Sequence, residues 1–258
     1  SISKEYCPIA ADRGIVCIDN TSHFRMEEGI PLVVPEVNKE ALANHKNIIA
    51  NPNCSTAQMM VVLKPILDAV GIKRVVVSTY QSVSGAGLSA IKELEDQSRA
   101  NLSGQQLEPK EFSAPIAFNV IPQIDVFLDN GYTKEEMKMI NETKKILGSD
   151  DIKVTATTVR VPVFVSHSEA INIETDQFLS ADDARKLLED TPGVKVVDDP
   201  SKLKYPTPRD AVGEDDVLVG RIRQDVSNDH GIELWCVGDN LRKGAALNAV
   251  QIAEALIE

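Results

Sequence analysis

Apolar residues along this chain follow two spacings, one typical of strands and one typical of helices. Short apolar runs at residues 14–19 and 47–50 suit buried strands, and residues 73–80 form a longer run of the same kind. Residues 152–175 are rich in β-branched side chains and predict one or two long strands. Because helical segments lie between the early strands, the first part of the chain predicts a parallel α/β sheet.

Capping residues mark where several helices begin and end. Thr133 and Glu136 form a capping box, in which each side chain accepts a hydrogen bond from the backbone amide of the other. Gly148 ends that helix, and Ser180 caps another. An Ala-rich amphipathic helix from residue 241 closes the chain. Further elements are expected as helices at residues 4–13, 55–70 and 88–100 and as a strand pair at 217–223 and 232–237.

The composition excludes some classes of function. The net charge is −12 and the isoelectric point is near 4.9, whereas nucleic-acid binding requires clustered Lys and Arg. No run of about 18 apolar residues occurs, so no membrane-spanning helix is predicted. An anionic substrate would need a local group of basic side chains, because the field of the whole protein repels it.

The four cysteines, Cys7, Cys17, Cys54 and Cys236, lie far apart. They lack the Cys-x-x-Cys spacing of zinc sites, so we expect no bound metal. A disulfide scaffold would be shorter and richer in cysteine. Reduced thiols, together with the lack of a secretion signal at the start of the sequence, predict a cytoplasmic protein.

The sequence begins at Ser1 without a methionine, and it opens directly into a helical segment. It contains no Gly-x-Gly-x-x-Gly phosphate loop. If a nucleotide-binding fold is present, we therefore expect its first half to lie outside this sequence.

The most specific chemical signal is the hexapeptide Asn51-Pro52-Asn53-Cys54-Ser55-Thr56. Pro52 stiffens a turn, and Cys54 is expected at or just before the N-terminus of the helix at 55–70. A helix N-terminus favours the thiolate, which is the reactive form of a cysteine. The spacing alone leaves two interpretations open, a catalytic nucleophile and a buried structural cysteine.

This hexapeptide resembles the nucleophile motif of the aspartate-semialdehyde dehydrogenases, and four later blocks are similar to that family in the same order. They are Ser78-Thr79-Tyr80-Gln81-Ser82-Val83-Ser84-Gly85-Ala86-Gly87, Glu135-Glu136-Met137-Lys138, Arg160 with His167, and Gly238-Asp239-Asn240-Leu241-Arg242-Lys243-Gly244-Ala245-Ala246. Five ordered blocks over nearly the whole chain are too many for a coincidence.

The resemblance implies three catalytic residues. Cys54 would attack the acyl carbon, Gln81 would orient the acyl intermediate beside it, and His167 would act as the acid and base. Without the resemblance, Gln81 fits a polar residue that ends a buried strand. A lone histidine in a β-rich region is also more often a satisfied core residue than a catalyst.

The resemblance also implies five substrate-binding residues. Arg160 would grip the substrate carboxylate at two points, and Glu135 would bind the substrate ammonium group. Lys138, Arg25 and Asn53 would bind the phosphate. Arg25, Lys138 and Arg160 would thus form the local basic group that an acidic protein needs. On spacing alone, Glu135 and Lys138 also fit a solvated pair on one helix face.

Four residues are implied for the cofactor. Ser84, Gly85 and Gly87 belong to a loop before a helix, where backbone amides can approach a nicotinamide or a phosphate closely. Glycines also end many strands, so this loop is a weak signal by itself. Asn240 would face the nicotinamide carboxamide, although its place before the last helix also fits an N-cap.

Arg160 and His167 present a geometric difficulty, because they lie seven residues apart on what reads as one extended segment. An odd separation puts two side chains on opposite faces of a regular strand. Pro162 can interrupt such a strand. If both residues serve one site, we expect an irregular backbone between them, a bulge or bend at or after Pro162. We also expect His167 within direct or one-water reach of the Cys54 sulfur.

The resemblance implies an α/β protein of two domains. Residues 1–53 and 238–258 would form a partial Rossmann-like NADP-binding domain, to which the last helix returns. Residues 54–237 would form an α+β catalytic and dimerisation domain with a mixed sheet.

The implied reaction is the reversible, NADP-dependent conversion of L-aspartyl-4-phosphate to L-aspartate-4-semialdehyde and inorganic phosphate through a cysteine thioester. It would serve the synthesis of lysine, diaminopimelate, threonine and methionine. The enzyme would be a homodimer. Two alternatives stay open. One is another acyl-phosphate reductase, such as the N-acetyl-gamma-glutamyl-phosphate type, and the other is a non-catalytic truncated chain.

Overall fold

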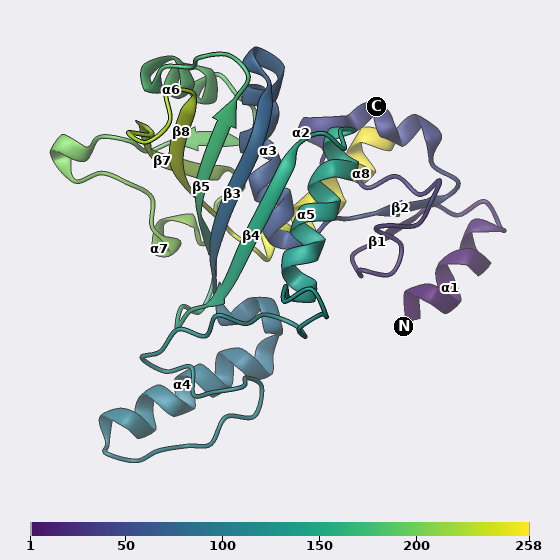
Figure 1. Cartoon of the computed structure of the whole chain (residues 1–258). Helices are drawn as coiled ribbons and strands as arrows, with labels where there is room; N and C mark the ends of the chain where they lie inside the picture. Colours follow the sequence, from purple (N-terminus) through teal and green to yellow (C-terminus); the bar gives the residue numbers. More distant parts are fainter. Residues whose placement is uncertain (1, 258) are drawn as a thin grey trace.

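The computed structural model describes residues 2–257, which form two sheets surrounded by helices (Figure 1). The α-helices are α1 (Ile2–Ala11), α2 (Pro35–Asn38), α3 (Cys54–Val70), α4 (Leu88–Leu102), α5 (Lys134–Leu147), α6 (Ala181–Glu189), α7 (Pro208–Ala211) and α8 (Leu247–Ile257). The strands are β1 (Cys17–Asp19), β2 (Ile48–Ala50), β3 (Ile72–Gln81), β4 (Lys153–Arg160), β5 (His167–Thr175), β6 (Val194–Val196), β7 (Val217–Gln224) and β8 (Gly231–Gly238). Shorter helical turns are η1 (Lys39–Asn44), η2 (Val83–Ala86), η3 (Pro200–Lys202) and the π-type turn η4 (Arg242–Ala246).

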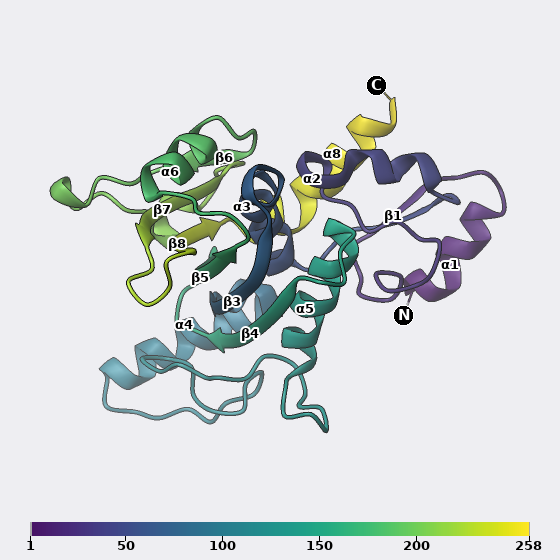
Figure 2. The ribbon, with the colours of Figure 1, turned by 45° about the horizontal axis from the view of Figure 1, so that its top comes forward.

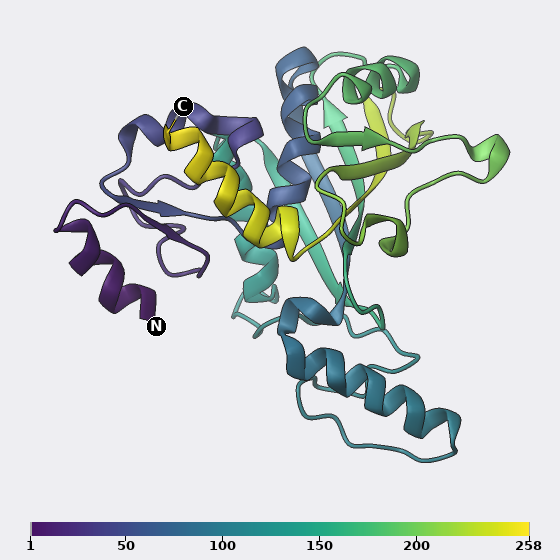
Figure 3. The same ribbon diagram turned by 180° about the vertical axis from the view of Figure 1, so that it is seen from behind.

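The larger sheet has the strand order β4-β3-β5-β8-β7-β6. β3 pairs with β4, and β6 with β7, in parallel, while the other neighbours are antiparallel. The mixed sheet that was predicted for this part of the chain is therefore confirmed. α3 and α6 cover one face of this sheet, and Figure 3 turns that face toward the viewer. Along β3, β4 and β5, no helix among the described residues covers the opposite face, which is turned to the viewer in Figure 1.

The sequence of α3 explains why this helix lies in the middle of the molecule. Its central residues are at most 1% exposed and include Met59, Met60, Val61, Val62 and Leu63. A helix that is apolar on every side must be covered on every side. The larger sheet packs against one side of α3 and α5 against another, so the start of α3 is fixed between them.

The capping signals on α5 are confirmed. Thr133 Oγ1 accepts from the Glu136 amide at 3.3 Å, and Glu136 Oε2 accepts from the Thr133 amide at 2.7 Å. Gly148 follows the helix in the left-handed conformation, with φ of 63°. These caps fix where α5 begins, and with it the side chains of its first turns.

The smaller sheet consists of the parallel strands β1 and β2, and α8 returns to it from the far end of the chain. Ile252 of α8 packs against Val33, Leu42 and Ile49, as expected for a last helix that rejoins the N-terminal part. Figure 2 shows α8 running from the large sheet past α2. The strand predicted at 14–19 was too long, because Ile15 is 56% exposed and only residues 17–19 pair with β2.

α4 and the segment that follows it project from one end of the larger sheet (Figures 1 and 3). This arm has its own small core, formed by Val83, Ala90, Leu94, Ile116 and Ile121. Within residues 2–257, no helix is both long and apolar enough to span a bilayer. The same residues contain no group of three or more His, Cys, Asp or Glu side chains that could hold a metal ion.

Candidate active site

Cys54 is the first residue of α3, as its motif predicted. Asn53 is the N-cap, and its Oδ1 accepts from the amides of Ser55 at 3.0 Å and Thr56 at 3.3 Å. Its Nδ2 donates to Glu135 Oε1 at 2.8 Å, which links the start of α3 to α5. One asparagine therefore both begins the helix and fixes a carboxylate beside the thiol.

Three neighbouring strands of the larger sheet carry predicted site residues at the same end of the sheet, namely Gln81, Arg160 and His167. Gln81 ends β3 and pairs in register with Arg160 at the end of β4. His167 begins β5, on the other side of β3, and pairs with Gly238 at the end of β8. His167 has the same strand parity as Ile171 and Ile173, which lie in the core under α3. The sheet order therefore assembles these residues into one row at the end nearest Cys54.

This arrangement resolves the odd spacing of Arg160 and His167. The interpretation of one extended segment was wrong, because the two residues lie on separate strands that flank β3. The irregular backbone between them is confirmed as a loop over residues 161–166. Ser166 in this loop has φ of 77°, an uncommon conformation for a residue other than glycine.

A cavity of about 360 Å³ opens beside Cys54. The predicted site residues that line it are Arg25, Asn53, Cys54, Gln81, Ser84, Gly85, Glu135, Lys138, Arg160 and Asn240. Gly87 and His167 are the two predicted residues outside this lining. Gly87 is exposed, whereas His167 is fully buried and its ring lies against Gly85. No contact fixes the distance from His167 to the Cys54 sulfur, so the expected reach between them stays a prediction.

Gly85 is required by its surroundings. A Cβ there would lie 3.1 Å from the Cε1 and Nε2 atoms of His167 and 3.2 Å from Nη1 of Arg160. Real Cβ contacts are seldom so short, so a side chain there would have to displace the imidazole or the guanidinium by a few tenths of an ångström. Glycine at this position gives the cavity a flat backbone wall.

The charged side of the cavity comes from α5. Lys138 lies 3.1 Å from Glu135 and 2.8 Å from Asp125. Glu142, two turns after Glu135, is 1% exposed; it pairs with Arg25 at 3.0 Å and accepts from the Asn53 amide at 2.7 Å. Asp125 and Glu142 were not predicted. Glu142 shares a helix face with Glu135 and Lys138, which is the signal that could have identified it.

Asn240 does not act as an N-cap. It is the Asp239 carboxylate that accepts from the Leu241 amide at 2.9 Å. Asn240 instead donates from Nδ2 to Ser84 Oγ at 2.9 Å, and its Oδ1 accepts from the Ser166 amide at 2.9 Å. The left-handed conformation of Ser166 thus turns its amide toward the side chain that faces the cavity.

The electrostatics of Cys54 differ from the sequence expectation. Burial, and then the negative charge of Glu135, raise the pKa of the Cys54 thiol to about 12. Arg160, Arg25 and the Ser55 amide act in the opposite direction but are outweighed. The helix N-terminus alone therefore does not produce a thiolate at Cys54.

His167 is neutral at ordinary pH, so one of its ring nitrogens is without a hydrogen. Burial, and then the charge of Arg160, lower the pKa of His167 to about 3. Ser82 contacts Nδ1 with its amide at 3.1 Å and its hydroxyl at 3.0 Å. The amide donates to Nδ1 and so favours the tautomer with its hydrogen on Nε2. In the other tautomer the hydroxyl can accept from Nδ1, but the amide loses its acceptor. Nε2 has no hydrogen-bond partner in residues 2–257.

Known proteins show the same architecture. Residues 63–243 match the family model "Semialdehyde dehydrogenase, dimerisation domain", and residues 1–45 match "Semialdehyde dehydrogenase, NAD binding domain". The aspartate-semialdehyde dehydrogenase of Shewanella sp. (strain DB6705) is 58% identical over 99% of this chain and 76% of its own length. The chain belongs to the aspartate-semialdehyde dehydrogenase family.

Solved structures of aspartate-semialdehyde dehydrogenases agree. The crystal structure of aspartate semialdehyde dehydrogenase II complexed with ASA, from Vibrio cholerae, is 57% identical, with a TM-score of 0.97. The match covers 99% of this chain and 76% of that chain. The aspartate semialdehyde dehydrogenase with NADP from Candida albicans is 26% identical with a TM-score of 0.76, over 99% of this chain and 74% of that chain.

Family membership confirms the resemblance read from the five sequence blocks, and with it the class of enzyme. The α/β fold with a mixed sheet is confirmed as well. The limits of the two domains and the role of each site residue stay predictions for an aspartate-semialdehyde dehydrogenase.

Proposed function

We propose that this protein catalyses the reversible, NADP-dependent conversion of L-aspartyl-4-phosphate to L-aspartate-4-semialdehyde and inorganic phosphate, through a thioester on Cys54. The observation that carries the proposal is the single cavity in which Cys54 meets both a carboxylate and several cations. In the cell this reaction would serve synthesis of lysine, through diaminopimelate, and of threonine and methionine. The expected site of action is the cytoplasm.

The charges around Cys54 fit an amino-acid substrate that carries a phosphate. Arg160 is 6% exposed and donates to the Ser82 carbonyl at 2.7 Å through Nη1, which leaves other guanidinium donors for a substrate carboxylate. Glu135 supplies the negative charge for the ammonium group. Arg25 and Lys138 supply positive charge for the phosphate, beside Asn53. A Vibrio cholerae relative bound to ASA, which we take to be the semialdehyde, supports this choice of substrate.

The chemistry on this chain begins with sulfur. The Cys54 sulfur forms a bond to the acyl carbon, and its proton passes to Nε2 of His167 when the ring carries its own hydrogen on Nδ1 and donates it to the Ser82 hydroxyl. The bond from the acyl carbon to the phosphate oxygen then breaks, and phosphate leaves toward Arg25 and Lys138. Gln81 Nε2 lies 3.4 Å from Glu135 Oε1 and presents its amide to the cavity, where it orients the thioester.

The cavity wall fits a nicotinamide. Gly85 offers a backbone surface that a side chain would fill, and Asn240 and Ser84 offer neutral amide and hydroxyl groups for a carboxamide. A nicotinamide bound there would supply or accept the hydride. The NADP-bound relative from Candida albicans and the match to an NAD binding domain support this proposal, and NADP is our choice between the two coenzymes.

The reaction can be tested with the full-length protein. We expect NADP to be reduced only when aspartate semialdehyde and phosphate are both present, followed by the absorbance of reduced nicotinamide. NAD should be a much poorer acceptor. N-acetylglutamate semialdehyde serves as the control substrate, because its blocked amine cannot pair with Glu135. Equal rates with the two semialdehydes would favour the other acyl-phosphate reductase.

Two variants on α5 separate recognition of the amine from recognition of phosphate. Glu135→Ala should raise the KM for the semialdehyde, and Lys138→Ala should raise mainly the KM for phosphate. Losing a charged hydrogen-bond partner costs roughly 1.5–3 kcal/mol, which is about ten- to hundred-fold in affinity. Lys134→Ala, at an exposed lysine on the same helix, is the matched control. Unchanged kinetics in both site variants would support the solvated surface pair instead.

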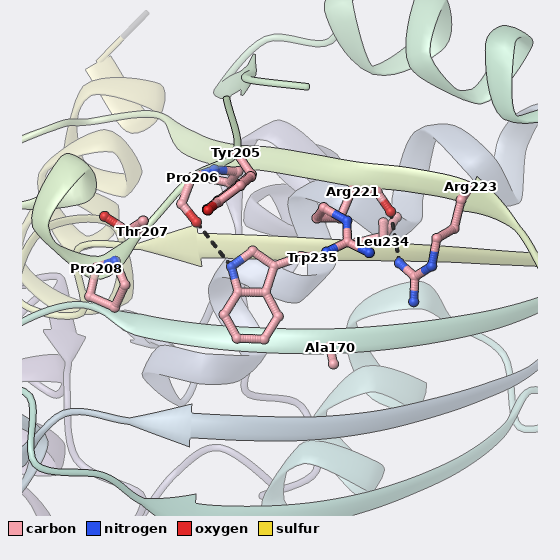
Figure 4. Close-up of a pocket in the computed structure, with 9 residues that line it drawn as sticks. All are labelled: Ala170, Tyr205, Pro206, Thr207, Pro208, Arg221, Arg223, Leu234 and Trp235. Atoms are coloured by element: carbon pink, nitrogen blue, oxygen red, sulfur yellow. Dashed lines mark hydrogen bonds between the residues drawn. The ribbon is translucent and has the colours of Figure 1, made fainter. Parts of the chain in front are cut away.

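We also propose a homodimer that forms on the uncovered face of the larger sheet. Tyr80 is 37% exposed there, and its ring lies 5.3 Å from that of Trp235. Figure 4 shows Trp235 on this face, beside a cavity of about 350 Å³, with its Nε1 donating to the Pro206 carbonyl at 3.1 Å. A second copy would remove these aromatic surfaces from water. The match to a dimerisation domain over residues 63–243 supports this proposal.

A further inference from the structure

A second polar row lies directly behind the row that contains Gln81 and His167. It consists of Thr79 on β3, Glu169 on β5 and Cys236 on β8, which pair in register and are fully buried. Gln58 covers this row from α3, where it stands one helical turn after Cys54. The row therefore lies next to Cys54 and His167, the two proposed reacting residues. It contains the carboxyl group of Glu169, which the proposed reaction does not use.

The contacts of Gln58 connect this carboxyl to His167. Gln58 Nε2 donates to the His167 carbonyl at 3.3 Å. The Gln58 side chain also interacts with the Glu169 carboxyl, and Glu169 Oε2 accepts from Cys236 Sγ at 3.4 Å. Gly238 makes room for this link, because a Cβ there would lie 2.6 Å from Gln58 Oε1. The path thus runs from Glu169 through Gln58 to the first residue of β5.

The protonation state of Glu169 decides whether Gln58 can keep its hydrogen bond to the His167 carbonyl. Neither Gln58 Oε1 nor Glu169 Oε1 has a donor in the part of the chain that the structure describes. A neutral carboxylic acid can donate its hydrogen to Gln58 Oε1 and satisfy both buried oxygens. An ionised Glu169 can only accept. The Gln58 amide would then have to turn Nε2 toward the carboxylate, and the bond to the His167 carbonyl would be lost.

We propose that Glu169 is a positioning residue, which as a neutral carboxylic acid holds Gln58 in the orientation that anchors His167. This inference rests on the acid–base role proposed for His167. Burial raises the pKa of Glu169 to about 8 and outweighs the hydrogen bonds from Cys236 and Gln58, which lower it, and this agrees with a neutral group at pH 7. The residues that face it are Thr79 from β3, Gln58 from α3 and Cys236 from β8. Burial also raises the pKa of the Cys236 thiol, so no charge on these neighbours favours the carboxylate.

The test compares pH profiles of kcat in the full-length enzyme. In the wild type, kcat should fall as the pH rises through about 8, because Glu169 loses its proton and releases Gln58. Glu169→Gln keeps a neutral donor, so its kcat should match the wild type near pH 7 and lack this alkaline fall. Glu169→Leu removes the donor and should lower kcat about 10- to 100-fold with little change in KM, the cost of misplacing a reacting group.

Ile173→Ala is the matched control, because Ile173 lies on the same face of β5, is fully buried and makes no polar contact with the site. It should reduce thermal stability but keep the wild-type pH profile. A wild-type kcat that stays flat through pH 8, or an alkaline fall that persists in Glu169→Gln, overturns the positioning role. These outcomes hold even if Glu169→Leu does not fold. Undiminished turnover in Cys54→Ala would instead overturn the proposed function.

Discussion

Replacing Cys54 with alanine is expected to lower kcat by about 10⁴- to 10⁶-fold, the scale seen when a covalent nucleophile is removed. The thioester cannot form without the sulfur, and no other cysteine lines the cavity within residues 2–257. Substrate and coenzyme binding should persist, because the charged groups that hold the substrate stay in place. Steady-state assays and isothermal titration on the same preparation measure both effects.

Cys17→Ala is the matched control for this prediction, because it makes the same change at a thiol outside the cavity. Cys17 Sγ donates over long distances to the carbonyls of Cys7 at 3.8 Å and Ile15 at 4.0 Å. Its kcat should equal that of the wild type. If Cys54→Ala and Cys17→Ala were equally active, the nucleophile would lie elsewhere.

Replacing His167 with asparagine is expected to lower kcat by about 10²- to 10⁴-fold, the usual contribution of general acid–base catalysis. Asparagine keeps polar atoms near Ser82 but cannot cycle a proton. Because the folded-state pKa of His167 is lowered to about 3, the ring stays neutral as pH falls through its ordinary value of about 6.5. The wild-type kcat/KM should therefore show no fall near pH 6.5 that comes from protonation of His167.

His230→Asn is the control for this variant, since His230 lies in the turn between β7 and β8, outside the cavity. It should leave kcat and its pH profile unchanged. A wild-type acid limb near pH 6.5 that His167→Asn removes would mean that the ring ionises there. Full activity in His167→Asn would show that the histidine is only a core residue.

Local signals in the sequence predicted much of the fold. The capping box at Thr133, the stop at Gly148 and the start of α3 beside Cys54 each depend on residues within one or two turns. Such interactions can be read from spacing because the partners are close in sequence. The strand predicted at 14–19 was too long because apolar character alone does not show which residues find a pairing partner.

The order of the strands could not be predicted in this way. Arg160 and His167 meet one site because β4 and β5 flank β3, a long-range arrangement that periodicity does not encode. Glu142 was missed for a similar reason. Its spacing places it on the helix face of Glu135 and Lys138, but its pairing with Arg25, far away in sequence, could not be read from that spacing. The raised pKa of Cys54 likewise depends on Glu135 and on burial by distant segments.

The approach of Gly244 to Cys54 has a consequence for synthesis of the protein. A Cβ on Gly244 would lie 2.7 Å from the Cβ of Cys54, so the turn before α8 lies directly against Cys54. Contacts between such distant parts of a chain are entropically costly and slow to form. α3 leaves the ribosome well before Gly244 does, since chains emerge from the N-terminus. The nascent chain therefore carries a more exposed Cys54 thiol, and one side of it is covered only when the segment that precedes α8 docks.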